Sequence, residues 1–189
     1  MDFMSDSLAC GRKIRTLNVL DDCSREVLAI EISTSIPAAR MVRTLTRLVE
    51  QRGCPATIRV DNGPEFTSHC FTYWAEMNHI TVQYTQPGKP MQNGFIERFN
   101  GTYRREILDA YLFFDIEELI ILTEKWMIEY NEHRPHEALG NRTPHEWSQR
   151  AAVDLVENYP SHKPDPKFTT NPQHNSNNSI FEKITFKPV

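Results

Sequence analysis

The sequence predicts a mixed α/β fold for this chain. Its N-terminal part contains segments in which apolar and polar residues alternate with period two, a pattern typical of half-buried strands. From residue 37 onward, segments with apolar residues three and four positions apart alternate with short strand-like segments, as expected where helices pack on a sheet. The chain has 189 residues, 39% of them hydrophobic, so it is long and apolar enough to bury one core.

Three strands are expected at the start of the chain. Residues 14–20 alternate with period two and residues 27–32 do so more loosely, with the turn-forming residues 21–25 between them. Gly11 marks an earlier turn, so residues 2–8 are expected to form the first strand. The opening segment is therefore predicted to be an antiparallel meander.

Helices and strands alternate in the next part of the chain. A helix is predicted over residues 37–53, because apolar side chains recur there at helical spacing between a proline and a glycine. A short strand over residues 57–60 runs into the turn formers of residues 61–64, so the aspartate that begins this turn lies at the end of a strand. A helix over residues 66–78 and a strand over residues 80–84 follow.

Two further helices complete the predicted core. The first follows the loop at residues 86–90, runs for about 18 residues and has an apolar stripe on one face. Its neighbouring face carries the polar side chains Asn93, Glu97, Asn100 and Arg104. The second helix is expected from Ile116 to about Glu132.

The predicted domain organisation is a core over residues 1–150 followed by a C-terminal extension over residues 151–189. Within the extension, residues 158–179 are rich in Pro, Asn, Ser and His and have little to bury, so this part is expected to be mobile. Residues 180–186 are apolar enough to add a late strand.

Composition and charge exclude several classes of protein. No apolar run approaches the ~18 to 20 residues of a membrane span, and the first ten residues carry two acids and no base, unlike a secretory signal. The four cysteines, at positions 10, 23, 54 and 70, form neither a CxxC pair nor a dense framework, so free thiols in the cytoplasm are expected. With a net charge of −4, any contact with nucleic acid must come from a local basic face.

Three acids stand where the predicted fold brings them together. Asp2 is on the first strand, Asp61 is at the end of a central strand and Glu97 is on a helix. Carboxylates without an obvious basic partner typically hold divalent cations. Each feature alone has an ordinary interpretation as well, because Asp-Asn-Gly-Pro is commonly a turn and a glutamate on a helix surface is commonly solvated.

The segments that carry these acids resemble the catalytic core of DDE transposases and retroviral integrases. The resemblance lies in residues 61–66 (Asp-Asn-Gly-Pro-Glu-Phe) and 94–100 (Gly-Phe-Ile-Glu-Arg-Phe-Asn), with 35 residues between the second acid and the third. Residues 130–139 (Tyr-Asn-Glu-His-Arg-Pro-His-Glu-Ala-Leu) and the Thr-Pro at residues 143–144 resemble the closing signature of the insertion-sequence branch of this family. The resemblance covers roughly residues 1–150.

This resemblance implies a ribonuclease H-like fold, in which a five-stranded mixed sheet is flanked by helices. It also implies an enzyme that cleaves DNA and transfers strands during integration or transposition. In such an enzyme Asp2, Asp61 and Glu97 are the catalytic triad and bind two Mg²⁺ or Mn²⁺ ions. Paired metals suit phosphodiester transfer because one activates the attacking oxygen and the other neutralises the leaving oxygen, and hard oxygen ligands favour these ions over zinc.

The first acid has competitors in the sequence. Asp6, Asp21 and Asp22 lie near Asp2 and are also aspartates of the N-terminal part. The family pattern, an apolar strand with Asp followed by Phe, favours Asp2. Asp21 and Asp22 are expected to cap a turn.

Several basic and polar residues around the third acid are candidates for DNA contacts. Asn93 lies one helical turn before it and Lys89 lies in the preceding loop, so both are candidates to touch a phosphate or a base edge. A helix N-cap region with a mobile lysine is the alternative. Arg98, Arg104 and Arg105 extend the same helix and are candidates to follow the DNA backbone, with surface solubility as the competing interpretation.

The implied partners are DNA, as element ends and as target, and further copies of the chain assembled on that DNA. The family reads its element ends with an upstream helix-turn-helix region. This chain is therefore expected either to be the core of a longer protein or to work with a separate helix-turn-helix subunit, in a bacterial cytoplasm at the nucleoid and without a membrane partner. The alternatives are an inactive DNA-binding or regulatory transposase remnant, and a ribonuclease H-like nuclease that cleaves RNA in hybrids.

Overall fold

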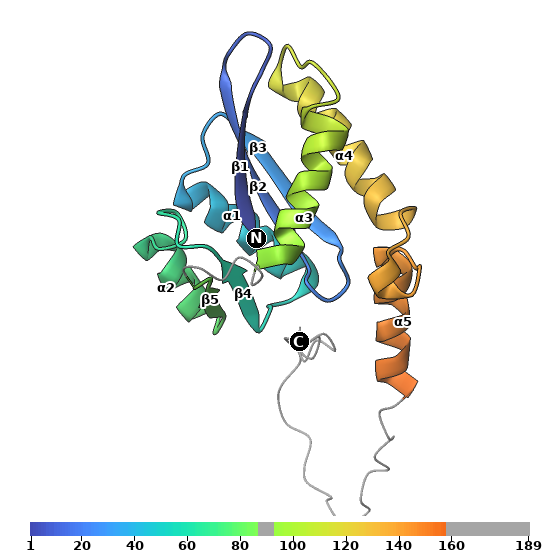
Figure 1. Ribbon diagram of the computed structural model, residues 1–189. Coiled ribbons are helices and arrows are strands. Elements are labelled where there is room, and N and C mark those ends of the chain that lie inside the picture. The colour runs from blue at the N-terminus through green and yellow to red at the C-terminus, as the bar shows by residue number, and fades with distance from the viewer. Residues whose placement is uncertain (87–92, 158–189) are drawn as a thin grey trace, which may run out of the picture.

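The computed structural model of the protein describes residues 1–86 and 93–157, with side chains as far as residue 150. In Figure 1 the first three strands stand at the centre, with α3 and α4 on one side and α1 and α2 on the other. Along the described part of the chain, no helix combines the length and apolar character needed to cross a bilayer.

The N-terminal meander is present as predicted. Strands β1 (Asp2–Ser7), β2 (Lys13–Leu20) and β3 (Val27–Ser33) form an antiparallel sheet in the order β1-β2-β3. The register pairs Asp2 with Asn18 and Asp6 with Ile14. Because β2 lies in the middle, its side chains are covered on both faces, and it is the most deeply buried of the three strands.

The remaining two strands form a separate sheet, which corrects the expectation of one continuous five-stranded sheet. Strand β4 (Thr57–Val60) pairs in parallel with β5 (Thr81–Tyr84). Where β1 meets β4, the Met1 ammonium donates a hydrogen bond to the carbonyl of Arg59 at 2.9 Å. A single bond is not a ladder, which needs successive backbone pairs. The α/β class and the strand number are as predicted, and the continuity of the sheet is not.

Two helices pack against each other, and their buried side chains share one core cluster with those of the second sheet. Helix α1 (Ala38–Arg52) begins after Pro37 and ends at Gly53, whose φ of +87° suits a glycine, so the predicted span is confirmed. Helix α2 (His69–Met77) begins three residues later than predicted. The reason is that the Oγ of Ser68 accepts from the Phe71 N–H at 3.3 Å and caps the helix there.

The long predicted helix after the second sheet is present in two parts. Helix α3 (Gly94–Tyr103) continues directly as a π-helical segment, η2 (Arg104–Leu108). Helix α4 (Ile116–Glu132) has the predicted bounds, and its N-terminus is capped by Asp115, which accepts from the Glu118 N–H at 2.9 Å.

A final helix was not predicted. A short 3-10 turn, η3 (Glu137–Leu139), is followed by α5 (Pro144–Glu157). Thr143 and Glu146 form a reciprocal capping box, with bonds of 3.2 and 3.0 Å, so the Thr-Pro-His-Glu segment carried a readable start signal. The predicted domain boundary after residue 150 falls inside α5. The predicted mobile tail and late strand lie outside the described residues.

The core consists of two clusters, one on each face of the N-terminal sheet. The cluster beneath α3 and α4 contains Ile14, Val27, Ile32, Ile96, Phe99, Tyr103, Ile107, Leu119 and Tyr130. The cluster beneath α1 and α2 contains Leu17, Val19, Ile36, Met41, Leu45, Val60, Phe66 and Phe71. The first cluster holds α3, with Glu97 in its first turn, over the face of β1 that carries Asp2.

Candidate active site

Asp2 lies on the face of β1 that is turned toward α3. The side chains of a strand alternate between its faces, and Met4, two residues on, packs in the cluster beneath α3 whereas Phe3 packs in the other cluster. The carboxylate of Asp2 is held on both oxygens. Its Oδ1 accepts from the Phe3 N–H at 2.7 Å, and its Oδ2 accepts from the Nδ2 of Asn100 at 2.8 Å.

Asp61 directly follows β4, as the sequence predicts. Its Oδ1 accepts from the Gly63 N–H at 2.8 Å, which closes a tight turn after the strand. A Cβ at Gly63 would lie 2.9 Å from this same oxygen, so a glycine is needed for so close an approach. The turn is tied to the end of β5, because Asn62 donates from its Nδ2 to the carbonyl of Thr85 at 2.9 Å.

Glu97 lies in the first turn of α3 with its side chain exposed. The flanking positions Ile96 and Phe99 point into the core and fix the rotation of the helix about its axis. With those two side chains buried, Glu97 is on the solvent side of the helix.

The three acids interact electrostatically. Burial raises the pKa of Asp2, the charges of Asp61 and Glu97 raise it further, and the Phe3 hydrogen bond and the Met1 ammonium act in the opposite direction. Both other acids therefore lie near enough for their charges to act on Asp2. Their side chains are not drawn together into a cage, because among the side chains described no three His, Cys, Asp or Glu residues form a group that could hold a metal ion.

The donor set nevertheless suits a hard divalent cation. Carboxylate oxygens are the ligands that Mg²⁺ and Mn²⁺ prefer, and the mutual repulsion of the acids is the condition that a bound cation relieves. Glu97 is exposed on its helix, and Asp2 and Asp61 stand at strand ends. The acids therefore fit such an ion in kind, with Glu97 the one that has most room to move.

Arg104, predicted as a DNA-backbone contact, is engaged within the fold. Its guanidinium pairs with Asp6 at 3.1 Å and with Asp109 at 3.6 Å, and it donates to the carbonyl of Ser5 at 3.0 Å. These contacts join the end of α3 to β1. Arg104, one of three arginines that the sequence offers as candidates for DNA, thus attaches α3 and η2 to β1 in the structure.

The other predicted DNA contacts lie on or beside α3. Asn93 is at the N-cap position of α3 but makes no capping bond with its side chain. Arg98 and Arg105 are exposed, and Arg105 approaches the hydroxyl of Thr102 at 3.4 Å. Lys89 lies outside the described residues. The structure therefore leaves Arg98 and Arg105 as the solvent-facing bases of this helix.

The Arg-Pro-His segment after α4 folds back on η2. Arg134 pairs with Glu106 at 2.6 Å, and the same carboxylate accepts from the Nε1 of Trp126 at 2.8 Å. Burial alone would raise the pKa of Glu106, but these hydrogen bonds and the charge of Arg134 bring it below its ordinary value. His136 packs edge-on against Tyr130, with ring centroids 5.1 Å apart. In the structure this segment is a turn whose contacts attach the end of α4 to η2.

Two residues near the acids had no assigned role in the sequence. Asn100 was identified only as a member of the polar face of its helix, and Asn18 was counted only within an alternating strand. Both are buried, at 9% and 0% exposure, and they are hydrogen-bonded to each other. The readable signal was an asparagine on a central strand, on the face that also carries Ile14 and Leu20.

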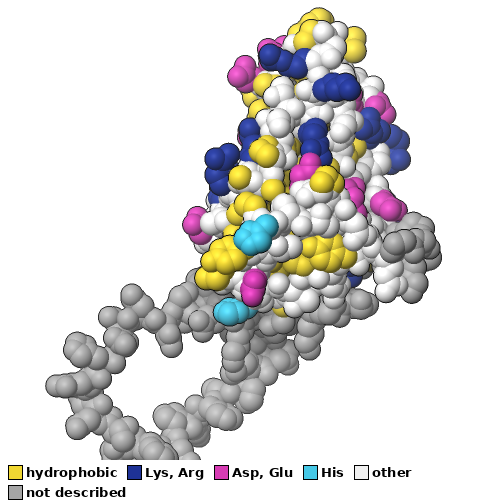
Figure 2. Space-filling model, turned by 90° about the vertical axis from the view of Figure 1, so that its left-hand side faces the viewer, with side chains coloured by type: hydrophobic (Ala, Val, Ile, Leu, Met, Phe, Trp, Pro, Cys, Tyr) yellow, Lys and Arg dark blue, Asp and Glu magenta, His cyan; other side chains and the backbone are white. Residues whose placement is uncertain are grey.

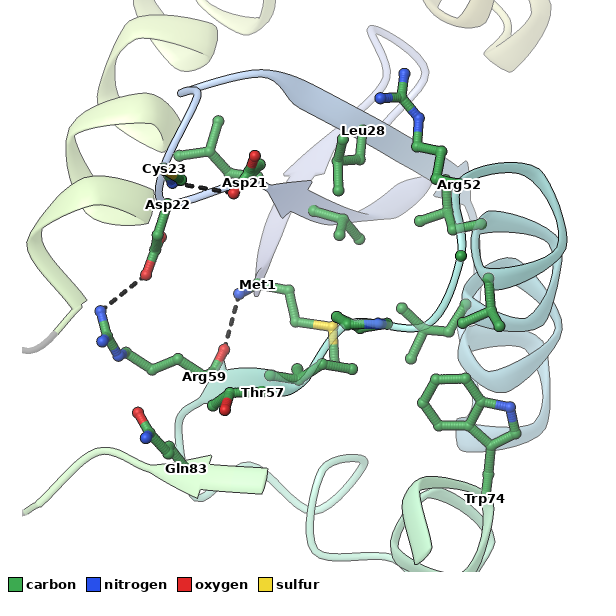
Figure 3. Close-up of a pocket in the computed structure, with 18 residues that line it drawn as sticks. Met1, Asp21, Asp22, Cys23, Leu28, Arg52, Thr57, Arg59, Trp74 and Gln83 are labelled. Carbon is green, nitrogen blue, oxygen red and sulfur yellow. Dashed lines mark hydrogen bonds and ion pairs between the residues drawn. The ribbon is translucent and has the colours of Figure 1, made fainter. Parts of the chain in front are cut away.

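A hydrophobic cavity lies beside this site but is not part of it (Figure 3). It lies between α1, the turn after β2 and strand β4, with Leu28 and Trp74 among its lining residues. The ion pair of Arg59 with Asp22, at 2.8 Å, stands at its edge. None of the three candidate acids lines this cavity.

Figure 2 shows the side of the molecule on which α2 lies. Lys and Arg side chains are concentrated in the upper part of this face, interspersed with acids, and hydrophobic side chains gather below them. Exposed apolar residues of α2 include Tyr73 and Met77. This face therefore carries bases and acids side by side in its upper part and exposed hydrophobic side chains below them.

Comparisons with known proteins agree with the resemblance seen in the sequence. Two models described as integrase core domain match the chain, one over residues 1–90 and the other over residues 78–144. The chain is 38% identical over 156 residues to the uncharacterized 31.7 kDa protein of insertion element IS407 from Burkholderia multivorans, covering 82% of this chain and 56% of that protein. It is 28% identical to the transposase InsD for insertion element IS2D from Escherichia coli, covering 78% of this chain and 52% of that protein. The chain thus spans about half the length of these relatives.

The fold is shared with solved structures of retroviral integrases. The HTLV-2 integrase catalytic core domain, solved in complex with magnesium, aligns with a TM-score of 0.58 at 20% identity. The alignment covers 77% of this chain and 93% of that domain. At this identity the likeness concerns the fold.

Proposed function

Since this chain belongs to the integrase core family, in its insertion-sequence branch, we propose that it is a transposase catalytic core that cleaves DNA and transfers strands. The substrates are the ends of a DNA element and a target duplex. The whole reaction is part of the proposal, because the chain spans only about half the length of its relatives.

One observation carries the proposal. Asp2, Asp61 and Glu97 come from three separate elements, and the charges of the other two acids act on Asp2. Acids that repel one another are not arranged for stability. Their electrostatic interaction supports a cation-binding centre that a bound metal would draw together. The hydrogen bond from the Met1 ammonium to the carbonyl of Arg59 supports the same assignment, because it brings the start of β1, with Asp2, beside the end of β4, which Asp61 follows.

In this proposal all three acids are metal ligands, held by different parts of the fold. Asp2 and Asp61 are ligands on strand ends, and their second contacts, to the Phe3 and Gly63 N–H groups, hold the carboxylates in place. Glu97 completes the set from the exposed start of α3. Two Mg²⁺ or Mn²⁺ ions, when bound, supply charge neutralisation on the attacking and the leaving oxygen. Asn93 at the N-cap of α3, Arg98 on α3 and Arg105 on η2 remain proposed DNA contacts, as does Lys89, which precedes them in the sequence.

A strand-transfer assay with labelled element-end DNA tests this function. The protein is expected to join the labelled ends to a target duplex when Mg²⁺ or Mn²⁺ is present, and to join none in chelator. The end sequence is taken from the element that encodes the chain. Cleavage of RNA in a hybrid without any joining of DNA would instead identify a nuclease of the same fold.

Divalent metal is expected to raise the melting temperature. The pKa of Asp2 is raised in the folded state, so the stability contributed by this carboxyl is largest below its unfolded pKa and decreases as the pH rises through the folded value. At neutral pH the charged acids thus cost stability, which a cation bound to the folded state returns. Thermal melts across Mg²⁺ and Mn²⁺ concentrations at fixed ionic strength measure the effect.

The matched control for this titration is Asp61→Asn. With one repelling charge removed, its metal-free melting temperature is expected to be higher than that of the wild type and its rise with metal smaller. Ca²⁺ is expected to stabilise the wild type as well but to support little chemistry, because it is larger and less exacting in its geometry. Equal metal responses of the two proteins would show that Asp61 is not a ligand.

An oligomer is expected on DNA. Joining two element ends to one target requires two active sites held in register, so more than one chain should assemble on the DNA. Sedimentation of the protein with end DNA measures the stoichiometry. A complex with one chain per duplex at all concentrations would contradict this, and a requirement for an added protein would point to a separate helix-turn-helix subunit.

A further inference from the structure

Two buried asparagines form a hydrogen-bonded chain that ends on the carboxylate of Asp2. Asn18, on β2, donates from its Nδ2 to the Oδ1 of Asn100 at 2.7 Å. Asn100, on α3, donates from its own Nδ2 to the Oδ2 of Asp2 at 2.8 Å. The chain therefore links the central strand, the helix that carries Glu97 and the strand that carries Asp2.

This arrangement is costly for the stability of the core. Asn18 is fully buried, and its Oδ1 has no hydrogen-bond partner within the described structure. Its neighbours on the same face of β2 are the buried Thr16 and the partly buried Leu20, with Ile14 one position further along this face. A buried acceptor without a partner lowers stability, and an apolar residue would pack at this position without that cost. Stability alone does not account for an asparagine here.

The position of Asn100 on its helix provides the alternative account. It follows Glu97 by three residues, about one helical turn, and Arg104 follows it by one further turn. Asn100 contacts Asp2 and, one turn later, Arg104 contacts Asp6. Two successive turns of the helix are therefore bonded to the same face of β1. These contacts fix the position of α3 along its axis and its rotation about that axis, both relative to β1. They thereby fix the separation between the carboxylates of Asp2 and Glu97.

The orientation of the Asn100 amide matters for the same reason. An amide has a donor side and an acceptor side, and a flipped Asn100 would turn its oxygen toward the carboxylate of Asp2. The N–H of Asn18 holds the oxygen of Asn100 and so keeps the donor side directed at Asp2. With Phe3 on Oδ1 and Asn100 on Oδ2, the carboxylate is fixed on both oxygens and keeps lone pairs for a cation.

We propose that Asn100 and Asn18 are positioning residues for the metal centre, Asn100 by fixing Asp2 and its distance from Glu97, and Asn18 by fixing Asn100. This inference rests on the proposed role of Asp2 as a metal ligand. Partners that orient a ligand typically change metal affinity by about 10- to 100-fold when they are removed.

The test compares metal binding by four variants of the whole chain. Asn100→Ala and Asn18→Ala remove the chain of amides, Asp2→Asn removes the ligand, and Asn131→Ala is the matched control. Asn131 makes two hydrogen bonds to the backbone of Val27, at 2.9 and 3.0 Å, and contacts none of the acids. For each variant, the Mn²⁺ concentration at half-maximal rise in melting temperature is measured from its own metal-free value, together with the Mg²⁺ dependence of strand joining.

Asn100→Ala is expected to raise the half-maximal Mn²⁺ concentration about 10-fold, and Asn18→Ala to raise it less. Asn131→Ala is expected to lower the metal-free melting temperature without moving the metal midpoint. Strand joining by Asn100→Ala should recover in part at high Mg²⁺, which a damaged fold would not do. If Asn100→Ala does not fold, Asn100→Leu replaces it, because leucine keeps the volume and donates no hydrogen bond.

Two results would overturn the inference, and only the second of them also counts against the proposed function. If Asp2→Asn weakens metal binding but Asn100→Ala behaves like Asn131→Ala, the amides are structural and Asp2 remains a ligand. If Asp2→Asn leaves the metal midpoint unchanged, Asp2 is not a ligand, and the proposed function loses its first acid together with the inference.

Discussion

Asp61→Asn and Glu97→Gln are expected to abolish DNA cleavage and joining, with a loss of at least about 10³-fold in rate. Each substitution removes a charged ligand, and the charge stabilisation supplied through a catalytic metal is worth several kcal/mol, which corresponds to rate factors of this size. The measurement is the yield of joined product with labelled end DNA at saturating Mg²⁺. Apart from Asp2→Asn, no other single change in the chain is expected to affect activity as strongly with so little effect on the fold.

The structure explains why these variants should stay folded. An asparagine at position 61 keeps an Oδ1 that accepts from the Gly63 N–H, and the side chain of Glu97 is exposed. The circular dichroism spectrum should therefore match the wild type. Glu124→Gln, which neutralises an exposed acid on α4, is the matched control and should retain full activity. Activity near the wild-type level in Asp61→Asn or Glu97→Gln would show that the triad has been assigned wrongly.

The largest expected loss of stability is that of Tyr103→Ala. The ring of Tyr103 is fully buried, with centroids 6.4 Å from Phe99 and 5.3 Å from Trp126, and its hydroxyl is hydrogen-bonded to that of Thr123 at 2.8 Å. Burial raises the pKa of Tyr103 to about 12, so the hydroxyl stays protonated at neutral pH. Removing this ring should lower the free energy of unfolding by about 3–5 kcal/mol.

Two further variants separate the contributions to this loss. Tyr103→Phe removes only the hydroxyl and should cost about 1 kcal/mol. Tyr111→Ala removes an exposed ring, 53% accessible, and should change stability by less than about 0.5 kcal/mol. Urea denaturation monitored by fluorescence gives all three values. A loss in Tyr103→Ala no larger than in Tyr103→Phe would mean that α3 does not depend on this ring for its attachment.

The attachment of α3 connects stability with function. Tyr103 lies six residues after Glu97 on the same helix, so a loosened α3 also loosens the third acid. Partial unfolding of this helix is therefore expected to reduce activity before the whole domain unfolds. Added metal should reduce the difference in activity between Tyr103→Phe and the wild type. The reason is that a bound cation would hold Glu97 from the side opposite the core.

Local patterns in the sequence determined most of the elements. The period-two segments became β2 and β3, and the segment before the turn at Gly11 became β1. The helix over residues 116–132 was found with its bounds, because periodicity and capping are local properties. The positions of Asp2, Asp61 and Glu97 on a strand, at a strand end and on a helix were predicted for the same reason. The unpredicted α5 also had a local signal, the Thr143 and Glu146 capping box.

Only the tertiary structure decided how these elements meet. Whether β4 joins β1 in a ladder depends on backbone pairing across 58 residues of sequence, and in the structure that pairing is reduced to the bond from Met1 to Arg59. The contacts of Asn100 with Asp2 and of Arg104 with Asp6 each span 98 residues. No local pattern encodes such pairs, because a polar side chain on a helix reads the same whether solvent, DNA or a buried carboxylate faces it. Burial between α3 and the sheet is what turned Asn100 from a surface residue into a partner of the first acid.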